Sequence, residues 1–209
     1  MADATISLGA ALTVLQEIRR PAQCQPGRVW LGPNPRNGMA AIPSAGQEVV
    51  LVDPHPDAPW SIVPLELRGA VKINVLMVWT RREHKYMQGL DKALTLYADF
   101  LLSGPSVVLG DFNANALWKQ PRQPADFSRV AVRLENQFGL VSAYHKWFNE
   151  PYGMETRPTH YFWRQRKRPF HIDYCFVPAS ANLHEVSVLD AEPWASLSDH
   201  RPLVVDFSL

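Results

Sequence analysis

An acid and an amide stand two positions apart, directly after a short apolar run, in the segment 107–113, Val-Val-Leu-Gly-Asp-Phe-Asn. The apolar residues 107–109 predict a buried strand, and Gly110 permits a turn or a close backbone approach. Alternate side chains of an extended chain project to the same side. Asp111 and Asn113 would therefore offer a carboxylate and an amide together at the carboxyl end of a strand, where α/β sheets carry their chemistry. Taken alone, these residues suit a plain polar turn equally well.

Two later segments add groups of the same kind. His171 and Asp173 stand in the apolar run 170–177, and the segment 198–202, Ser-Asp-His-Arg-Pro, leads into a third apolar run at 203–207. Three predicted strand edges therefore carry Asp-x-Asn, His-x-Asp and Asp-His. Because histidine titrates near neutral pH and carboxylates bind hard cations, this set suits metal-assisted hydrolysis of an anionic ester.

The order and spacing of these segments resemble the DNase I-like endonuclease/exonuclease/phosphatase superfamily. Its signature includes a Gly-Asp-x-Asn segment, a later Asp-Tyr segment and a C-terminal Ser-Asp-His. The resemblance extends from about residue 12 to the C-terminus. It implies one domain over residues 1–209 with a four-layer α/β/β/α sandwich, in which two packed mixed β-sheets are flanked by helices. Periodicity by itself indicates only an α/β or α+β class.

The resemblance also implies a divalent metal ion, Mg²⁺ with Mn²⁺ as an alternative. Glu17 follows the apolar run 12–15 and Gln16, as the main metal-binding glutamate of the family follows a strand. Glu17 and Asp199 are the implied ligands, because a hard cation takes oxygen ligands and neutralises the charge that develops on a phosphate. Without the other motifs, Glu17 would be a solvated residue at the start of a loop.

Further residues take catalytic roles through the same resemblance. Asp111 positions or deprotonates the attacking water, and Asn113 donates to phosphate oxygens. His200 is the general base or a phosphate ligand, and Asp173 holds its imidazole in the required tautomer. Tyr86 directs its hydroxyl to the phosphate, or is a half-buried aromatic at a helix start. A second ion at Asp111, Asn113 and His200 is an alternative to a single ion.

The sequence departs from the family in two places. Family members begin with a strand that carries an asparagine, followed by a helix. In this chain no asparagine precedes Glu17, and a strand, a helix and their turns would take roughly thirty residues that are missing here. Loss of a central strand leaves ladder groups unpaired. We therefore expect an N-terminally truncated domain of lowered stability and activity, or a misassigned start. Trp79 stands where many members carry a phosphate-binding histidine, although indole has a single donor and does not titrate.

The composition is that of an ordinary globular protein. The 209 residues are 46% hydrophobic and 20% charged, with a formal net charge of +1, so net charge gives no argument for nucleic acid. The two cysteines, Cys24 and Cys175, are too few for a disulfide scaffold. We expect reduced thiols in a cytoplasmic monomer, with one disulfide as the alternative. The sequence shows no recognisable signal peptide or transmembrane stretch.

Periodicity predicts the elements that must hold these residues. A helix over 86–102 carries leucines at helical spacing and ends at Ser-Gly-Pro, and a second helix over 127–138 is capped by Gly139. Besides the strands around the motifs, we expect strands near 29–31, 38–42, 48–52, 62–67, 71–78 and 140–144, a strand that begins within 158–163, and an edge strand within 181–191.

Two loops beside the predicted site carry cations. Residues 115–126 include Trp118, Lys119 and Arg122, which could hold a nucleotide by stacking and charge or form a solvated loop with one anchored tryptophan. The run 164–168, Arg-Gln-Arg-Lys-Arg, forms a predicted hairpin turn. Such runs are normally solvated, but this position suits phosphate contacts. Both loops favour DNA or RNA as the phosphate-ester substrate.

The remaining histidines carry less information. We expect His171 to be a surface-strand residue, and His145, His160 and His184 have no motif support. Three functions stay open: a nuclease-type phosphodiesterase, a phosphatase or phospholipid phosphodiesterase of the same superfamily, and a truncated non-catalytic α/β module. A structural metal protein is disfavoured, because no Cys/His cluster has ligand spacing.

Overall fold

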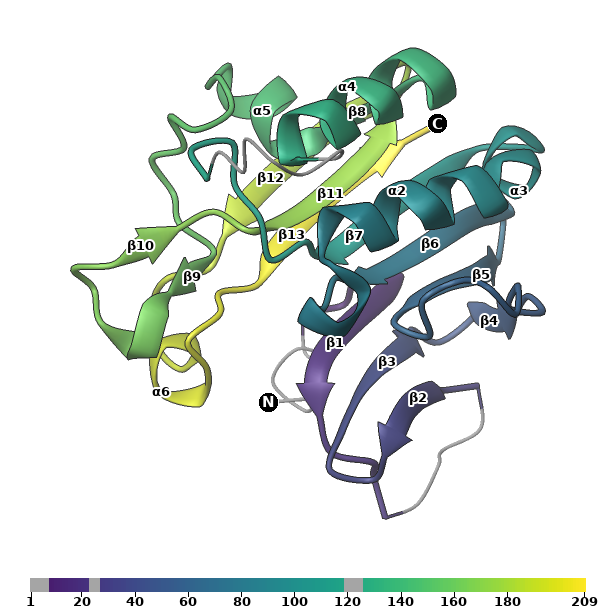
Figure 1. The fold of residues 1–209 in the computed structure, drawn as a ribbon, viewed down its shortest axis with the longest axis horizontal. Coiled ribbons are helices and arrows are strands. Elements are labelled where there is room, and N and C mark those ends of the chain that lie inside the picture. Colours follow the sequence, from purple (N-terminus) through teal and green to yellow (C-terminus); the bar gives the residue numbers. More distant parts are fainter. Residues whose placement is uncertain (1–7, 23–26, 119–125) are drawn as a thin grey trace.

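The computed structural model describes residues 8–22, 27–118 and 126–209, and its centre is a six-stranded mixed sheet (Figure 1). The strand order is β4-β5-β6-β7-β11-β8. Strands β6 and β7 run parallel, and the other neighbours are antiparallel. The strands are β4 (Glu48–Leu51), β5 (Ile62–Arg68), β6 (Ile73–Trp79), β7 (Ser106–Asp111), β8 (Leu140–Ser142) and β11 (Asp173–Pro178).

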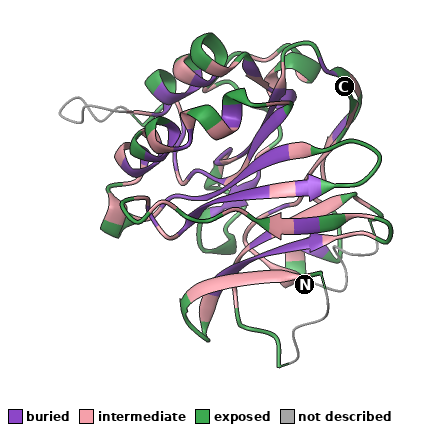
Figure 2. Ribbon diagram, turned by 90° about the vertical axis from the view of Figure 1, so that its right-hand side faces the viewer, coloured by how far each residue is buried: buried purple, intermediate pink, exposed green. Residues whose placement is uncertain are grey.

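Helices cover one face of this sheet, as Figures 1 and 2 show. They are α2 (Met87–Leu96), α3 (Ala98–Leu102) and α4 (Phe127–Phe138). Asp126 caps α4 by accepting the backbone N–H of Arg129 at 3.0 Å, and Gly139 ends it with a φ of 65°, as expected for a left-handed cap. Buried side chains on this face include Leu76, Leu90, Leu94, Val108, Phe112, Leu134 and Phe176.

Shorter antiparallel sheets cover the other face. One has the order β1-β3-β2, and β12 pairs with β13 in another. Met39 of the first sheet packs with Leu65 and Met77 of the central sheet, while Val186 of the second packs with Val107 and other residues. A further small hairpin joins β9 to β10. These strands are β1 (Leu12–Ile18), β2 (Val29–Asn34), β3 (Asn37–Pro43), β9 (His160–Tyr161), β10 (Pro169–Phe170), β12 (Asn182–Val188) and β13 (Leu203–Ser208).

Alternation along the central strands separates the two cores. Val107 faces the short sheets and Val108 faces the helices, because successive side chains of a strand point to opposite faces. The arrangement confirms the predicted class of packed sheets flanked by helices. Within the described residues no helix is long and apolar enough to cross a membrane.

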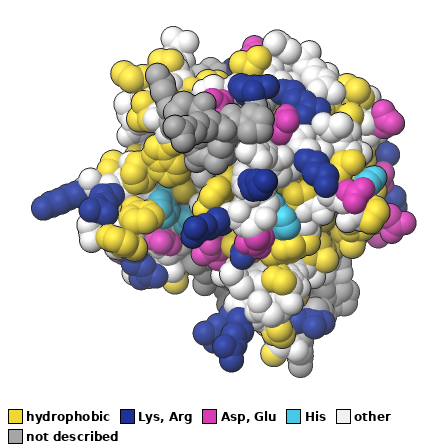
Figure 3. All heavy atoms as spheres, viewed as in Figure 1, with side chains coloured by type: hydrophobic (Ala, Val, Ile, Leu, Met, Phe, Trp, Pro, Cys, Tyr) yellow, Lys and Arg dark blue, Asp and Glu magenta, His cyan; other side chains and the backbone are white. Residues whose placement is uncertain are grey.

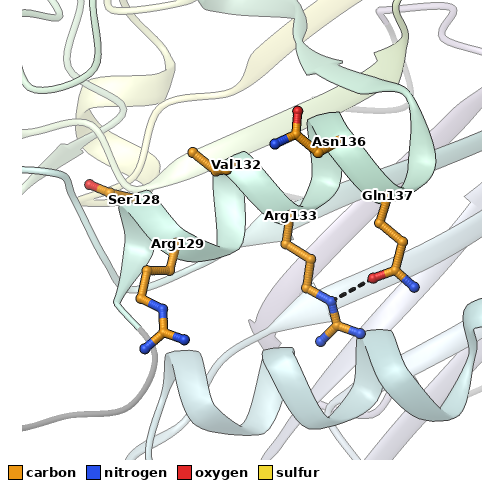
Figure 4. Close-up of a pocket in the computed structure, with 6 residues that line it drawn as sticks. All are labelled: Ser128, Arg129, Val132, Arg133, Asn136 and Gln137. Atoms are coloured by element: carbon orange, nitrogen blue, oxygen red, sulfur yellow. Dashed lines mark hydrogen bonds between the residues drawn. The ribbon is translucent and has the colours of Figure 1, made fainter.

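Short helical segments lie in the connections: η1 (Arg82–His84), α5 (Ala143–Phe148), η2 (Phe162–Arg164) and α6 (Trp194–Leu197). A shallow groove runs along α4 and is lined by residues of that helix alone (Figure 4). Its Arg133 donates to Gln137 at 2.8 Å and to the Asp91 carboxylate of α2 at 2.7 Å. The groove therefore lies where α4 packs against α2, away from the predicted site residues.

Three predicted elements are wrong in their extent. The helix over 86–102 is interrupted at Tyr97, whose backbone leaves helical geometry and whose hydroxyl accepts the N–H of His55 at 3.0 Å. The strand over 140–144 stops at Ser142, because α5 begins at Ala143. The run 170–177 is divided between β10 and β11, and the two residues between them turn inward.

Candidate active site

Asp111 is the last residue of β7 and lies at the centre of the candidate site. It is opposite Asp173 on β11 and beside Trp79 on β6, and it is 2% exposed. Gly110 precedes it with a φ of 136°. A Cβ there would lie 2.0 Å from the carbonyl oxygen of Val78, so only glycine allows this approach of β7 to β6.

Asn113 holds the Asp111 carboxylate in place. Its backbone N–H donates to Oδ1 at 2.7 Å, and its amide Nδ2 donates to Oδ2 at 2.7 Å and to the Thr80 carbonyl at 3.1 Å. The φ of Asn113 is 46°, a conformation that asparagine tolerates well. Both amide hydrogens of Asn113 thus have protein partners, and a phosphate oxygen would replace one of them.

His200 and Asp173 form an ion pair next to Asp111. The Nδ1 of His200 lies 3.0 Å and 3.2 Å from the two carboxylate oxygens of Asp173. Burial lowers the pKa of His200. The charges of Asp173, Asp111 and Asp199 and the hydrogen bond that His200 donates to Asp173 outweigh burial and raise the pKa to about 10. His200 is therefore an imidazolium near neutral pH.

The three residues Asp111, Asp173 and His200 bring ligand atoms within 4.8 Å of one another. Burial raises the pKa of Asp111 well above its usual range, and the negative charge of Asp173 raises it further. The His200 imidazolium and the Asn113 N–H act in the opposite direction. The two facing carboxylates share a site in which positive charge is stabilising.

Glu17 reaches the same centre from β1. Its φ of 57° coincides with an irregularity in the pairing of β1 with β3 between Leu15 and Ile18, and such a bulge re-aims a side chain. The preceding Gln16 donates to the Val78 carbonyl at 3.5 Å, above Gly110. Glu17 is exposed, and its charge also raises the pKa of Asp111.

Asp199 lies on the other side of His200. Its Oδ2 is 3.7 Å from Nε2 of His160, and Asp199, His160 and His200 form a second group with ligand atoms within 4.8 Å. Among the described residues, Glu17 belongs to neither group, so the two predicted metal ligands Glu17 and Asp199 do not share one cluster in the structure. His160 had no motif support, because its contact with His200 joins strands far apart in the sequence.

Thr159 is a second residue that the motifs missed. Its buried Oγ1 accepts the N–H groups of Ile172 at 3.0 Å and Asp173 at 3.1 Å. Its carbonyl accepts the N–H of Arg201 at 2.7 Å. Thr159 therefore ties the backbone of Asp173 to the residue that follows His200. The Pro-Thr dipeptide before an aromatic run was its only sequence signal.

The prediction of a surface position for His171 is wrong. Its ring is buried, its Nδ1 lies 3.0 Å from the Arg157 carbonyl, and it packs on the ring of Tyr144. Burial lowers the pKa of His171. The break between β10 and β11, held by Thr159, turns this side chain inward.

The other predicted contributors lie around the cluster. Tyr86 is half-buried at the start of α2 with a φ of 47°; within the described residues its hydroxyl has no hydrogen bond, and its role stays a prediction. Trp79 is buried beneath the guanidinium of Arg81, 4.1 Å from its ring centroid. Trp118 packs edge-on against Phe170, with ring centroids 4.9 Å apart, so this tryptophan itself is anchored.

Several predicted residues lie outside the described ranges or carry no site contact. Lys119 and Arg122 of the cationic loop, and Cys24, are outside the described residues. Cys175 is a buried free thiol, and burial raises its pKa to about 12.

The hairpin between β9 and β10 presents exposed aromatic and basic groups beside the site. Trp163 is 67% exposed, with a φ of 55°, and the Arg168 guanidinium lies 5.2 Å from its ring centroid. Phe162 is also exposed and contacts the ring of His160. Figure 3 shows apolar and basic side chains gathered over this hairpin.

The donor chemistry of the cluster fits the divalent ion that the resemblance implies. Asp111 and Asp173 contribute carboxylates to one cluster, the charge of Glu17 also acts on Asp111, and oxygen ligands are those that Mg²⁺ prefers. Burial, and after it the charge of Asp173, raises the pKa of Asp111, and a cation beside it would stabilise the ionised carboxylate. The residues present are thus suited to a hard divalent ion.

Comparison with known proteins gives two kinds of similarity. The model of the Endonuclease/Exonuclease/phosphatase family matches residues 8–200, while curated protein sequences give no match. Among solved structures, the 3′ phosphatase NExo from Neisseria bound to product DNA hairpin is 21% identical with a TM-score of 0.72, over 100% of this chain and 94% of that chain. The 3′-5′ exonuclease NExo from Neisseria meningitidis is 22% identical with a TM-score of 0.69 over the same shares.

A third solved structure is the endonuclease domain of TRAS1, a telomere-specific non-LTR retrotransposon. It is 16% identical with a TM-score of 0.62, over 98% of this chain and 88% of that chain. At these identities the structures establish the fold, and the family match extends over most of the chain. This protein belongs to the endonuclease/exonuclease/phosphatase family, whose members are hydrolases of phosphate esters.

Proposed function

We propose that this protein is a divalent-metal-dependent phosphodiesterase that cleaves nucleic acid. The observation that carries the proposal is the cluster of Asp111, Asp173 and His200 with ligand atoms within 4.8 Å. It combines a buried carboxylate, an imidazolium and the carboxylate that orients it. Anionic phosphate needs positive charge to enter such a site.

Glu17 and Asp199 supply the proposed metal-binding carboxylates, for Mg²⁺ or Mn²⁺. When bound, the ion neutralises charge on the phosphate. Asp111, held by Asn113 through two hydrogen bonds, orients the attacking water and takes its proton. A carboxylate of raised pKa is a better base near neutral pH than an ordinary aspartate.

His200 acts as a phosphate ligand in this proposal. With a pKa of about 10 it carries a proton near neutral pH, and it donates a charge-assisted hydrogen bond to a non-bridging oxygen. Asp173 holds the ring through Nδ1 and leaves Nε2 for the substrate. Asn113 and Tyr86 donate to the remaining phosphate oxygens.

DNA or RNA is the proposed substrate because of the surface next to the cluster. The exposed ring of Trp163 stacks on bases, and Arg164, Arg166 and Arg168 of the same hairpin attract the backbone. Similar solved structures include a phosphatase bound to a DNA hairpin and an exonuclease. We propose that the protein acts as a cytoplasmic monomer.

Cleavage assays with the purified full chain test this function. Substrates are a 5′-labelled DNA duplex with and without a 3′-phosphate, supercoiled plasmid, RNA, and a simple phosphodiester. We expect Mg²⁺-dependent cleavage that EDTA abolishes. Asp111→Asn should lower kcat by about 10²–10⁴-fold, whereas the exposed Asp206→Asn on β13 should keep wild-type activity.

Three results would contradict the proposal. Cleavage that persists in EDTA would show that the reaction needs no divalent metal ion. Equal activity in Asp111→Asn and wild type would show that the cluster is not the active site. Turnover of the simple phosphodiester alone, with no cleavage of DNA or RNA, indicates a different phosphate ester. Circular dichroism and a cooperative melt for each variant show that loss of activity is not loss of folding.

A further inference from the structure

Two histidines face each other across a short antiparallel pair beside the candidate site. His160 forms an isolated bridge with His200. The flanking bonds run from Tyr161 N–H to the Asp199 carbonyl at 2.9 Å and from Arg201 N–H to the Thr159 carbonyl at 2.7 Å. His160 and His200 are thus a non-hydrogen-bonded pair, the type in which opposite side chains lie closest. Their ring centroids are 4.5 Å apart.

The ring of His160 is buried without a hydrogen bond among the described residues. The residue is 8% exposed, and its Nδ1 is enclosed with no partner. Its Nε2 lies 3.7 Å from Oδ2 of Asp199, too far for a hydrogen bond. Neither ring nitrogen of His160 therefore has a hydrogen bond, and a buried polar ring left unpaired is costly. A ligand between Nε2 and the Asp199 carboxylate would satisfy one of the two nitrogens.

We propose that His160, Asp199 and His200 form a binding site for a divalent transition-metal ion of the Zn²⁺ class. Their ligand atoms lie within 4.8 Å of one another. Two ligand atoms that each lie about 2.1 Å from a tetrahedral ion are roughly 3.4 Å from each other. The distance from Nε2 of His160 to Oδ2 of Asp199 is 3.7 Å, so a small shift would let both atoms bind one ion. Asp199 is 44% exposed on its side chain, which gives the ion a path from solvent.

The donor set selects the kind of ion. Two imidazoles and one carboxylate suit Zn²⁺ or Co²⁺, whereas Mg²⁺ prefers oxygen ligands. Nδ1 of His200 is already held by Asp173, so Nε2 is the atom left for the metal, which binds there in place of the Nε2 proton. A carboxylate on the second nitrogen of a metal-binding histidine fixes its ring and raises its basicity.

Occupation of this site has a consequence that rests on the proposed function. The Nε2 of His200 that binds the transition ion is the atom that would donate to the phosphate. One nitrogen cannot serve both, so the ion and the substrate compete for His200. Asp199 is also a proposed ligand of Mg²⁺, so the transition-metal ion competes with Mg²⁺ as well. Micromolar Zn²⁺ should therefore inhibit Mg²⁺-dependent cleavage.

A Co²⁺ titration of the metal-free full chain tests the site without any substrate. Visible d–d absorption reports the coordination of Co²⁺, and calorimetry with Zn²⁺ measures affinity. We expect one ion per chain, with Co²⁺ retained in millimolar Mg²⁺. His160→Asn should weaken binding by at least about tenfold, while His184→Asn, an exposed histidine on β12, should bind as the wild type does.

The outcomes that overturn the site are equal Co²⁺ affinity in His160→Asn and wild type, or no saturable binding at all. Asp199→Asn provides a second variant, which must also weaken binding. Melting curves of both variants without metal show whether they are folded. Because metal binding is measured without hydrolysis, this test stays valid even if the nuclease assay shows no activity. In a separate experiment, the inhibition of cleavage by Zn²⁺ is compared between wild type and His160→Asn.

Discussion

Each charged residue of the candidate site depends on neutral neighbours that fix its atoms. Asp111 is positioned by the N–H groups of Asn113, and Asp173 by the hydroxyl of Thr159 on its backbone N–H. Arg201 donates to the carbonyl of Ser198 at 2.8 Å and pairs with Asp190 at 2.7 Å. These contacts hold the loop that carries His200. Preorganisation of this kind lets the charges act without rearrangement.

Thr159 provides a direct test of such positioning. Thr159→Val keeps the shape of the side chain but leaves the buried N–H groups of Ile172 and Asp173 without an acceptor, which costs about 1–3 kcal/mol for each group. We expect a loss of roughly 3 kcal/mol in the free energy of unfolding, measured in urea, and a lower kcat in the folded variant.

Thr159→Ser is the matched control, because it keeps the hydroxyl and removes only a methyl group. It should recover most of the kcat that Thr159→Val loses. Equal kcat in the valine variant and the wild type would show that Thr159 does not position Asp173.

At the residue scale, the sequence predicted groups that sit inside contiguous motifs. Asp111 and Asn113 come together as their spacing indicated, and Asp173 and His200 come together as the family resemblance implied. His160 and Thr159 could not be found in this way, because their partners lie in strands that meet only after folding. His171 was misplaced because a strand pattern does not reveal that a neighbouring hydroxyl interrupts the strand.

The element that follows α5 shows how a connection is stabilised. Glu150 accepts from the Tyr144 hydroxyl at 2.7 Å, from the Thr156 N–H at 2.8 Å and hydroxyl at 2.6 Å, and from Arg157 at 3.0 Å. This network connects the end of α5 to the chain leading into Thr159. Burial alone would raise the pKa of Glu150, but the hydrogen bonds from Thr156 and Tyr144 lower it to about 2.

Glu150 therefore gives a pH-dependent contribution to stability. Because its pKa is lower in the folded than in the unfolded chain, the contribution is present above about pH 4.5 and is lost as the pH falls through about 2. Glu150→Gln should lower the free energy of unfolding by about 2 kcal/mol at pH 7. The difference from wild type should narrow between pH 4.5 and pH 2.

Urea unfolding at a series of pH values measures this difference. Glu185→Gln on β12, an exposed position, should show no such pH dependence. If the gap between Glu150→Gln and wild type stays constant down to about pH 2, the altered hydrogen bonding of the amide is responsible, and the charge of Glu150 is not.

At the element scale, long periodic segments were predictable and short ones were not. Helix α4 has the predicted bounds, because its apolar stripe and Gly139 are local signals. Helix α5 was missed because its six residues are too few for a helical period to stand out. The interruption at Tyr97 depends on a hydrogen bond to His55, which no local pattern contains.

At the scale of the whole molecule, the site lies where three layers meet. Asp111 ends β7 and Asp173 begins the neighbouring β11. Glu17 comes from β1 of a short sheet, and His200 from the segment that leads into β13. On the opposite face of the central sheet, the helices pack on a core that contains Phe112, which lies next to Asp111, and Phe176. Geometry at the cluster therefore depends on both cores together.

Phe176 tests that dependence. Its ring is fully buried on β11, 5.7 Å from Phe112 and 6.1 Å from Tyr174. Phe176→Ala removes this packing and should lower the free energy of unfolding by about 3–5 kcal/mol, corresponding to a fall in melting temperature of roughly 10 °C. The exposed Leu102→Ala on α3 should stay within about 0.5 kcal/mol of wild type.

The decisive measurement follows melting with two probes, far-UV circular dichroism and nuclease activity after brief heating. Because one core underlies the site and the central sheet, both probes should give the same lowered midpoint in Phe176→Ala. Activity lost well below the structural midpoint would show instead that the site opens locally while the sheet stays folded. In that case the short sheets, with Glu17 on β1 and His200 just before β13, form a separate and weaker unit, and the two cores act independently.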